Sequence, residues 1–280
     1  MAMFSYCSLV FSRVLAAVLI MGLCWLLHSE AWAVAPNPSL PLTEQQLQAG
    51  EALANQAFAA TEAGDFATAE HYWTELINDF PQNPAVWSNR GNARVSQNKL
   101  DAAIADFNQA IELAPDQADP YLNRGTALEA QGNFQAAITD YNQVLKIDPQ
   151  DAFAYNNRGN AEGGLGDWPA ALADFQQATT IAPDFAFAQA NTALALYELG
   201  ETQQAMTAMK KLVRKYPMFA DMRAALTAVL WAEGQQGEAE SNWVAAVGVD
   251  GRYQNLTWVR EIRRWPPKMI NALDQFLSLN

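Results

Sequence analysis

A short pattern returns at a spacing of 34 residues, and this spacing limits the possible folds more than any other feature of the chain. The pattern is Asn-Arg-Gly-x-Ala, and it begins at Asn89, Asn123 and Asn157. A fixed period of about 20–50 residues is typical of repeat proteins, in which each repeat packs against its neighbours. The period continues without insertion through six segments: 50–83, 84–117, 118–151, 152–185, 186–219 and 220–253.

Several positions of the period recur for physical reasons. Position 15 is glycine in five segments and Asn98 in the other, which suits a left-handed residue that ends a helix. Small residues at positions 8 and 20 let two antiparallel helices approach closely, and a large residue at position 24 fills the space between one helix pair and the next. Position 32 is proline in five segments, which ends a helix because proline lacks an N–H and clashes with the preceding turn. Each segment is therefore predicted to be a helix hairpin.

These residues resemble the motif of the tetratricopeptide repeat family, which has an aromatic at position 4, glycine at 8, alanine at 20, an aromatic at 24 and proline at 32. The outer segments are degenerate, as terminal repeats often are. The resemblance implies an all-α fold, a right-handed superhelical solenoid of antiparallel helix hairpins, with six repeats over 50–253. Three consecutive segments carry the match: Trp87, Gly91, Ala103, Phe107 and Pro115; Tyr121, Gly125, Ala137, Tyr141 and Pro149; and Tyr155, Gly159, Ala171, Phe175 and Pro183.

Residues 1–33 have the layout of a secretory signal peptide. One positive charge precedes an unbroken apolar run from Val14 to Leu27, and Ala31-Trp32-Ala33 supplies the small residues that signal peptidase needs. We expect cleavage after Ala33 and export, and an uncleaved anchoring helix is the alternative. Residues 34–49 are predicted to be a proline-containing linker and then a leading helix capped by Thr43.

The period stops after residue 253, and residues 254–280 form a tail with two open interpretations. The first is a C-terminal capping helix that covers the apolar edge of the last repeat, because Met269, Ile270, Leu273, Phe276 and Leu277 fall on one helical face. The second is a docking element for a partner. Its side chains would be Trp258, Arg263, Arg264 and Trp265.

The sequence offers no constellation for catalysis, metal binding or a cofactor. Both cysteines, Cys7 and Cys24, lie in the predicted signal peptide, and His71 is the one histidine after it, so we expect a protein that is not an enzyme. The net charge of −13 argues against nucleic-acid binding, which needs a basic surface. Residues 34–209 carry 6 basic and 22 acidic side chains, whereas residues 210–268 carry 10 basic and 6 acidic ones. The basic end would allow proximity to an anionic membrane surface.

In the family that the chain resembles, the first helix of each repeat lines a concave groove that binds ligands. Position 6 of this helix is asparagine in five repeats, similar to the asparagine ladder in the repeat domain of O-GlcNAc transferases. An amide donates and accepts hydrogen bonds, so a row of amides would hold an extended peptide backbone. The alternative is that the asparagines bond to neighbouring helices and organise the stack. The predicted groove residues are Asn55, Asn89, Asn123, Asn157 and Asn191, with Asn92 and Asn160 at position 9 and Tyr197 and Trp231 at position 12.

The predicted function is a non-catalytic scaffold that binds a protein or peptide partner. The tail from Trp258 to Pro267 and the signal-like segment also resemble those of cyanobacterial tetratricopeptide proteins and their chloroplast-lumen relatives. This resemblance implies the thylakoid lumen or periplasm and a role in assembling or maintaining photosynthetic complexes. The family's chaperone-binding clamp needs basic residues at positions 2, 5 and 6, and these are absent here. The alternative function is a structural element that associates with itself through its terminal repeats or tail. The sequence predicts no oligomeric state.

Overall fold

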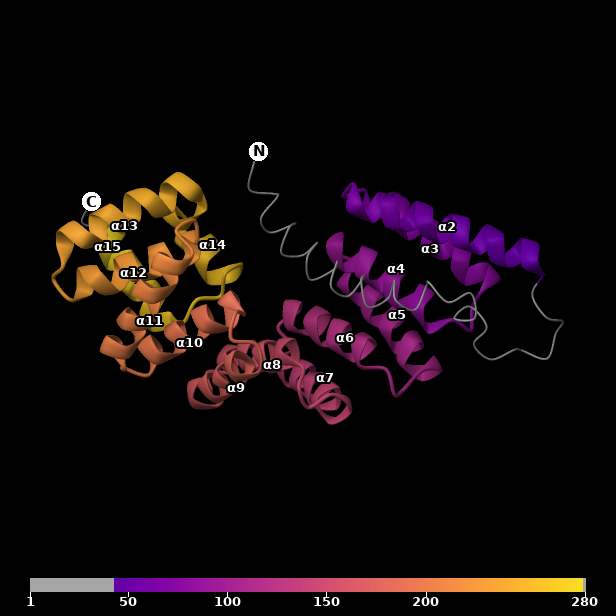
Figure 1. The fold of residues 1–280 in the computed structure, drawn as a ribbon, viewed down its shortest axis with the longest axis horizontal. Helices are drawn as coiled ribbons and strands as arrows, with labels where there is room; N and C mark the ends of the chain where they lie inside the picture. The colour runs from indigo at the N-terminus through magenta and orange to yellow at the C-terminus, as the bar shows by residue number, and fades with distance from the viewer. Residues whose placement is uncertain (1–42, 279–280) are drawn as a thin grey trace. The chain divides into compact units, whose positions relative to one another are not determined.

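The computed structural model describes residues 43–278, and every regular element in that range is helical (Figure 1). The predicted fold class is thereby confirmed, while the predicted signal peptide and most of the predicted linker lie outside the described residues. The helices are α2 (Glu44–Glu62), α3 (Phe66–Asp79), α4 (Pro84–Ser96), α5 (Leu100–Leu113), α6 (Ala118–Ala130), α7 (Phe134–Ile147), α8 (Ala152–Gly164), α9 (Trp168–Ile181), α10 (Ala186–Glu198), α11 (Thr202–Lys215), α12 (Ala220–Ala232), α13 (Gln236–Val249), η1 (Gly251–Gln254), α14 (Leu256–Glu261) and α15 (Pro267–Ser278).

The helix starts follow the sequence period. From α4 onward the first helices of the repeats begin at positions 84, 118, 152, 186 and 220, and the second helices begin at 100, 134, 168, 202 and 236. Position 15 has a positive φ in every repeat, for example +59° at Asn98 and +78° at Gly132. The left-handed residue reverses the chain between the two helices of each hairpin, as the sequence predicted.

The predicted leading helix is not a separate element. Helix α2 runs unbroken from Glu44 to Glu62, so the leading turns continue directly into the first helix of the first repeat. Thr43 caps this helix as predicted, because its Oγ1 accepts from the Gln46 backbone N–H at 3.2 Å. In return, Oε1 of Gln46 accepts from the Thr43 backbone N–H at 2.9 Å, which completes a capping box.

The glycine at position 8 makes room for the aromatic ring at position 24 of the same hairpin. A Cβ placed on Gly125 would lie 2.6 Å from Cε1 of Tyr141, and one on Gly91 would lie 2.6 Å from Cε1 of Phe107. Both rings are fully buried. The sequence predicted that the ring separates one hairpin from the next, and the structure shows that it also fills its own hairpin. The glycine therefore sets the distance between the paired helices.

The described chain falls into two compact units, divided between Asp148 and Pro149, and each is described by itself. The first unit contains α2 to α7, and the second contains α8 to α15. The largest buried apolar cluster lies in the second unit and joins α10, α11, α12 and α13 to the tail.

Helix α15 caps the second unit, as one interpretation of the tail predicted. It packs on α12 and α10, and its Met269, Leu273 and Phe276 are buried in the apolar cluster of that unit. The buried carboxylate of Asp221 anchors the segment before it. One carboxylate oxygen accepts from Tyr253 Oη at 2.7 Å, from Arg263 Nε at 2.8 Å and from Trp265 Nε1 at 3.0 Å.

None of the helices in residues 43–278 has both the length and the apolar content needed to cross a lipid bilayer.

Candidate functional site

The predicted row of asparagines lies on the first helices of the repeats, one on each of α2, α4, α6, α8 and α10. Asn55 is exposed, and Asn89, Asn123, Asn157 and Asn191 are half-buried. In repeats two to five, position 6 therefore faces neither the core nor open solvent. A polar side chain at such a place can satisfy its amide through neighbouring helices or through a bound segment.

In the second unit the asparagines form a hydrogen-bonded network. Nδ2 of Asn191 donates to Oδ1 of Asn156 at 3.0 Å and to Oδ1 of Asn160 at 3.1 Å, and Nδ2 of Asn156 donates to Oδ1 of Asn157 at 3.2 Å. Asn156 is buried at position 5, and the sequence interpretation missed it. A polar residue at a position that is alanine in three other repeats was the available signal.

This network fixes which amide groups of Asn157 and Asn191 remain without a hydrogen bond. Asn191 uses both of its amide hydrogens, so its Oδ1 remains an acceptor, while Asn157 uses Oδ1 and keeps its NH2 as a donor. Within residues 149–278 no other hydrogen bond reaches these two groups. Adjacent repeats thus present one acceptor and one donor.

In the first unit the amides are not engaged in this way. Within residues 43–148 the side-chain amides of Asn89, Asn92 and Asn123 make no hydrogen bond with the protein, and Asn92 accepts from Ser96 only through its backbone oxygen. Part of the row is therefore hydrogen-bonded within the second unit. The amides of Asn89, Asn92 and Asn123 have no such bond among residues 43–148.

Tyr197 and Trp231 do not line an open groove, because α15 covers them. Tyr197 is only 5 % exposed, and the ammonium group of Lys268 lies 4.7 Å from its ring centroid. The ring of Trp231 meets Phe276 edge to face at 5.2 Å. The structure therefore gives each of these two rings a partner within the chain, and their predicted role in ligand binding stays a prediction.

The packing of α15 on the second unit also fits the end of the asparagine row at the last repeat. Ala225 takes position 6 there, is fully buried and belongs to the apolar cluster that includes α15. An asparagine at this position would bury its amide without a partner, which costs free energy.

The arginines at position 7 brace the stack. Arg124 makes a two-pronged ion pair with Asp140 of its own repeat, at 2.6 Å and 2.8 Å, and a third bond reaches Oδ1 of Asn108 in the preceding repeat at 2.6 Å. Its guanidinium lies 5.6 Å from the ring of Tyr121. The hydrogen bonds to Asp140 raise the pKa of Arg124, so the charge is permanent.

Arg90 pairs with Asp106 and Arg158 with Asp174 in the same way. The acid belongs to the same repeat as the arginine, and the contact with the preceding repeat is made to Thr74 for Arg90 and to Asn108 for Arg124. We call this arrangement of positions 7 and 23 the brace.

The four residues of the predicted docking tail differ in how deeply they are buried. Trp265 is 3 % exposed and, like Arg263, bonds to Asp221 inside the cap. Trp258 is half-buried against Tyr253, with ring centroids 5.2 Å apart, and Arg264 is exposed at a left-handed φ of +51°. For Arg263 and Trp265 the structure favours the capping interpretation.

Among residues 43–278 there is no group of three or more His, Cys, Asp or Glu side chains that could hold a metal ion. His71 is exposed, and its Nε2 lies 3.4 Å from Oε1 of Glu75 on the same helix.

Family comparisons place repeats of one kind across the middle of the chain. A model described as "TPR repeat" matches residues 91–132 and 127–163, and models described as "Tetratricopeptide repeat" match residues 152–185 and 188–217. Among curated proteins, the chain is 41% identical over 58 residues to "Hsp70-Hsp90 organizing protein 2" of Arabidopsis thaliana, a match to 21% of this chain and 10% of that protein. It is 36% identical over 69 residues to "Tetratricopeptide repeat protein 36" of Bos taurus, covering 25% of this chain and 37% of that protein. The chain thus spans well under half the length of these relatives.

Solved structures share the fold at low sequence identity. The Cut9–Hcn1 hetero-tetramer of the APC/C matches with a TM-score of 0.66 and 16% identity over 81% of this chain and 43% of that chain. A tetratricopeptide repeat protein from Parabacteroides merdae matches with a TM-score of 0.61 and 18% identity over 83% of this chain and all of that one. YrrB, described as a TPR protein with an unusual peptide-binding site, has a TM-score of 0.51 and 18% identity over 64% of this chain and 92% of that chain. The chain therefore contains tetratricopeptide repeats, and its described helices have the fold of tetratricopeptide-repeat proteins.

Proposed function

We propose that this chain is a scaffold that binds an extended segment of a partner protein along the first helices of its repeats. The observation that carries the proposal is the pair of oriented amides in the second unit. Asn157 keeps a donor and Asn191 keeps an acceptor, and a peptide unit offers the complementary C=O and N–H. Because these bonds would go to the backbone, they would contribute affinity with little regard to the side chains of the partner.

The repeats do not contribute equally to this function. In the first unit Asn89 and Asn123 hold half-buried amides without a protein partner among residues 43–148, so binding would complete their hydrogen bonds. In the second unit α15 already covers the equivalent surface of the last repeat. We therefore assign binding to the repeats that precede it.

The comparisons support an interaction role in general terms. YrrB is described as having a peptide-binding site, and the organizing protein of Arabidopsis thaliana is named for two chaperones. A chaperone carboxylate is not the ligand that we propose here, because positions 2, 5 and 6 of the repeats carry no lysine or arginine.

The proposal is tested with the double variant Asn123→Ala/Asn157→Ala on an array of extended peptides. The matched control is Gln135→Ala/Gln176→Ala, which removes two exposed amides from the second helices α7 and α9 of the same two repeats. We expect peptide binding to be lost in the first variant and kept in the control, with similar melting temperatures. A marked fall in melting temperature with peptide binding intact would refute groove binding and assign the amides to the stack.

We further propose that the scaffold acts after export, in the thylakoid lumen or periplasm, in the assembly or maintenance of photosynthetic membrane complexes. The signal-like pattern of residues 1–33 and the resemblance of the tail support this proposal. N-terminal sequencing of the protein from its native source tests the location. A first residue of Val34 is expected, and a first residue of Met1 would contradict cleavage. Crosslinking of the exported protein, followed by identification of its neighbours, tests the process.

Self-association through the tail is not the function that we propose, since Trp265 and Phe276 are 3 % and 1 % exposed within the second unit. Light scattering on the full chain would overturn this choice if it showed a dimer that Arg264→Ala or Trp258→Ala abolishes.

A further inference from the structure

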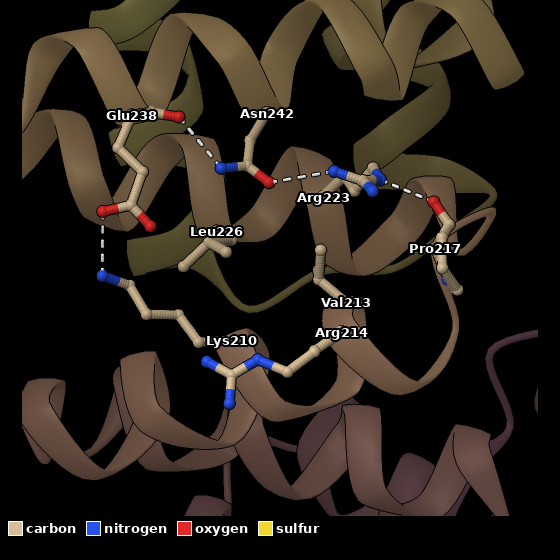
Figure 2. A pocket seen from close by; sticks show the side chains of 8 residues that line it. All are labelled: Lys210, Val213, Arg214, Pro217, Arg223, Leu226, Glu238 and Asn242. Atoms are coloured by element: carbon tan, nitrogen blue, oxygen red, sulfur yellow. Dashed lines mark hydrogen bonds and ion pairs between the residues drawn. The ribbon is translucent and has the colours of Figure 1, made fainter.

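A pocket of about 330 Å³ opens between α11, α12 and α13, and none of the asparagines of the row lines it (Figure 2). Lys210, Val213 and Arg214 reach it from α11, and Arg223 and Leu226 reach it from α12. Pro217 in the loop between these helices and Glu238 and Asn242 of α13 complete the lining. The volume lies at the lower end of the range of about 300–1,000 Å³ that small-molecule sites occupy.

The pocket lies where the brace is found in the central repeats. Position 7 of this repeat is Leu226 instead of arginine, and position 23 is Asn242 instead of aspartate. The shorter leucine vacates the space that an arginine stem takes in repeats two to four. The neutral amide removes the buried carboxylate that balances the arginine in those repeats.

Arg223, at position 4, makes two hydrogen bonds that in the second repeat are made by two different side chains, the position-4 aromatic and the position-7 arginine. Its Nε donates to the backbone oxygen of Pro217 at 2.6 Å, as the indole of Trp87 donates to Pro81 at 2.8 Å. One terminal nitrogen donates to Oδ1 of Asn242 at 3.2 Å, as the brace arginines donate to aspartate. The guanidinium is therefore held rigidly at the pocket wall, and its second terminal nitrogen makes no hydrogen bond among the described residues.

The charges around the pocket do not balance. Lys210 is paired with Glu238, with Nζ and Oε2 at 2.9 Å, which leaves Arg214 and Arg223 without a carboxylate among residues 43–278 (Figure 2). Lys210 and Arg214 stand four residues apart on α11, so they repel each other. In the braces, by contrast, each arginine faces an aspartate. Two uncompensated positive charges are the complement of one doubly charged anion.

We propose that this pocket binds a phosphate group, either as the free anion or as a phosphate monoester. Arginine forks and a lysine ammonium are the usual donors to phosphate oxygens, and the group carries close to two negative charges at neutral pH. Val213, Leu226 and the Pro217 ring form an apolar wall that a small organic substituent on the phosphate would contact. The site shares no residue with the peptide surface proposed above, so a failure of either proposal would leave the other unaffected.

Three variants of the full chain test the site by calorimetric titration with inorganic phosphate and phenyl phosphate at pH 7.5. Arg214→Gln removes a cation that has no ion-pair partner among the described residues. Asn242→Asp restores the carboxylate of the brace and leaves every cation in place. The matched control is Lys211→Gln, which removes one exposed charge from α11 outside the pocket lining.

We expect phosphate affinity to fall at least about tenfold in Arg214→Gln and Asn242→Asp and to stay unchanged in Lys211→Gln. Melting temperature serves as the check on folding, and Asn242→Asp is expected to keep it because aspartate is native at this position in three repeats. A higher affinity for phenyl phosphate than for inorganic phosphate would support the monoester, and equal affinities would support the free anion.

Three results would overturn the proposal. The first is no measurable phosphate binding by the unaltered chain. The second is equal binding by all variants, which would mean that general surface charge is responsible. The third is binding to vesicles of anionic phospholipid, but not to phosphate, that Lys211→Gln weakens as much as Arg214→Gln does. This last result would describe a diffuse basic face toward a membrane and no pocket.

Discussion

Replacing the glycine at position 8 by alanine tests how the helices of a repeat are spaced. In Gly125→Ala the new Cβ would lie 2.6 Å from Cε1 of Tyr141 and 3.0 Å from two further atoms of that ring. The ring has little freedom to move away, because Tyr141 is fully buried and its hydroxyl donates to Glu129 at 3.0 Å. The helices must therefore separate or the ring must leave its rotamer.

Two effects of opposite sign decide the outcome. Alanine stabilises a helix interior by about 1 kcal/mol relative to glycine. Inserting a methyl group into a packed core costs about 1–3 kcal/mol. With three ring atoms at or under 3.0 Å the second effect should win, and we expect a net loss of about 1 kcal/mol in the free energy of unfolding.

Gly248 supplies the matched control. It lies in α13, has no atom within 4 Å of an added Cβ, and is exposed. Gly248→Ala should therefore show the helix effect alone and raise the free energy of unfolding by up to about 1 kcal/mol. The same substitution thus has opposite signs at the two sites.

Urea unfolding followed by far-ultraviolet circular dichroism measures both variants, with the slope of the transition as a check that the unfolded state is unchanged. The double variant Gly125→Ala/Tyr141→Leu removes the ring that the methyl group meets. It should be more stable than the sum of the two single changes predicts, by about 1 kcal/mol. If Gly125→Ala stabilises the chain as much as Gly248→Ala does, the ring does not require the glycine and the reasoning is wrong.

Three further predictions concern the brace, a surface ion cluster and a helix end. Asp140→Ala should lower the free energy of unfolding by about 2 kcal/mol in urea titrations. This is less than the cost of about 3–5 kcal/mol for breaking a fully buried ion pair, because the Arg124 side chain is 23% exposed. An unchanged urea midpoint would show that the brace does not stabilise the repeat. Although burial acts to raise it, hydrogen bonds from Lys99, Arg94 and Gln97 lower the pKa of Glu70 from 4.5 to about 2, so its contribution to stability is full above pH 4.5 and is lost as the pH falls toward 2. Glu70→Gln should therefore flatten the loss of stability between pH 5 and 2.5, and identical pH profiles would disprove the assignment. Asn98→Ala should cost about 1 kcal/mol because φ is +59°, whereas Asn98→Gly should cost nothing, and thermal melts compare the two.

The hairpins were predictable because each depends on residues close together in the chain. Gly132 and Gly166 follow the first helices of their repeats with a left-handed residue. Thr43 caps the start of α2 through a hydrogen bond with Gln46, three residues further along the chain. Such local geometry repeats wherever the local sequence repeats. The apolar face of α15 was visible for the same reason.

The partners of individual side chains were less predictable. Arg124 pairs with Asp140 of its own repeat, because positions 7 and 23 face each other across the hairpin, and the sequence pattern alone did not single out this pair. The predicted ligand-binding roles of Tyr197 and Trp231 assumed an open surface. The spacing of residues within a repeat cannot show that a segment more than 30 residues further along the chain covers them.

The sequence by itself determined the repeat, its helix boundaries and the row of asparagines, because a 34-residue period sets which side chains share a helical face. Only the tertiary structure decided which of those faces stay open. Helix α15 folds back on α10 and α12, and Ala225, at which the row ends, is buried in the apolar cluster that includes α15. It also decided that Leu226 and Asn242 leave a cationic pocket where repeats two to four have a brace. Both outcomes depend on contacts between residues distant in the chain, and burial and charge balance at such contacts are properties of the packed molecule.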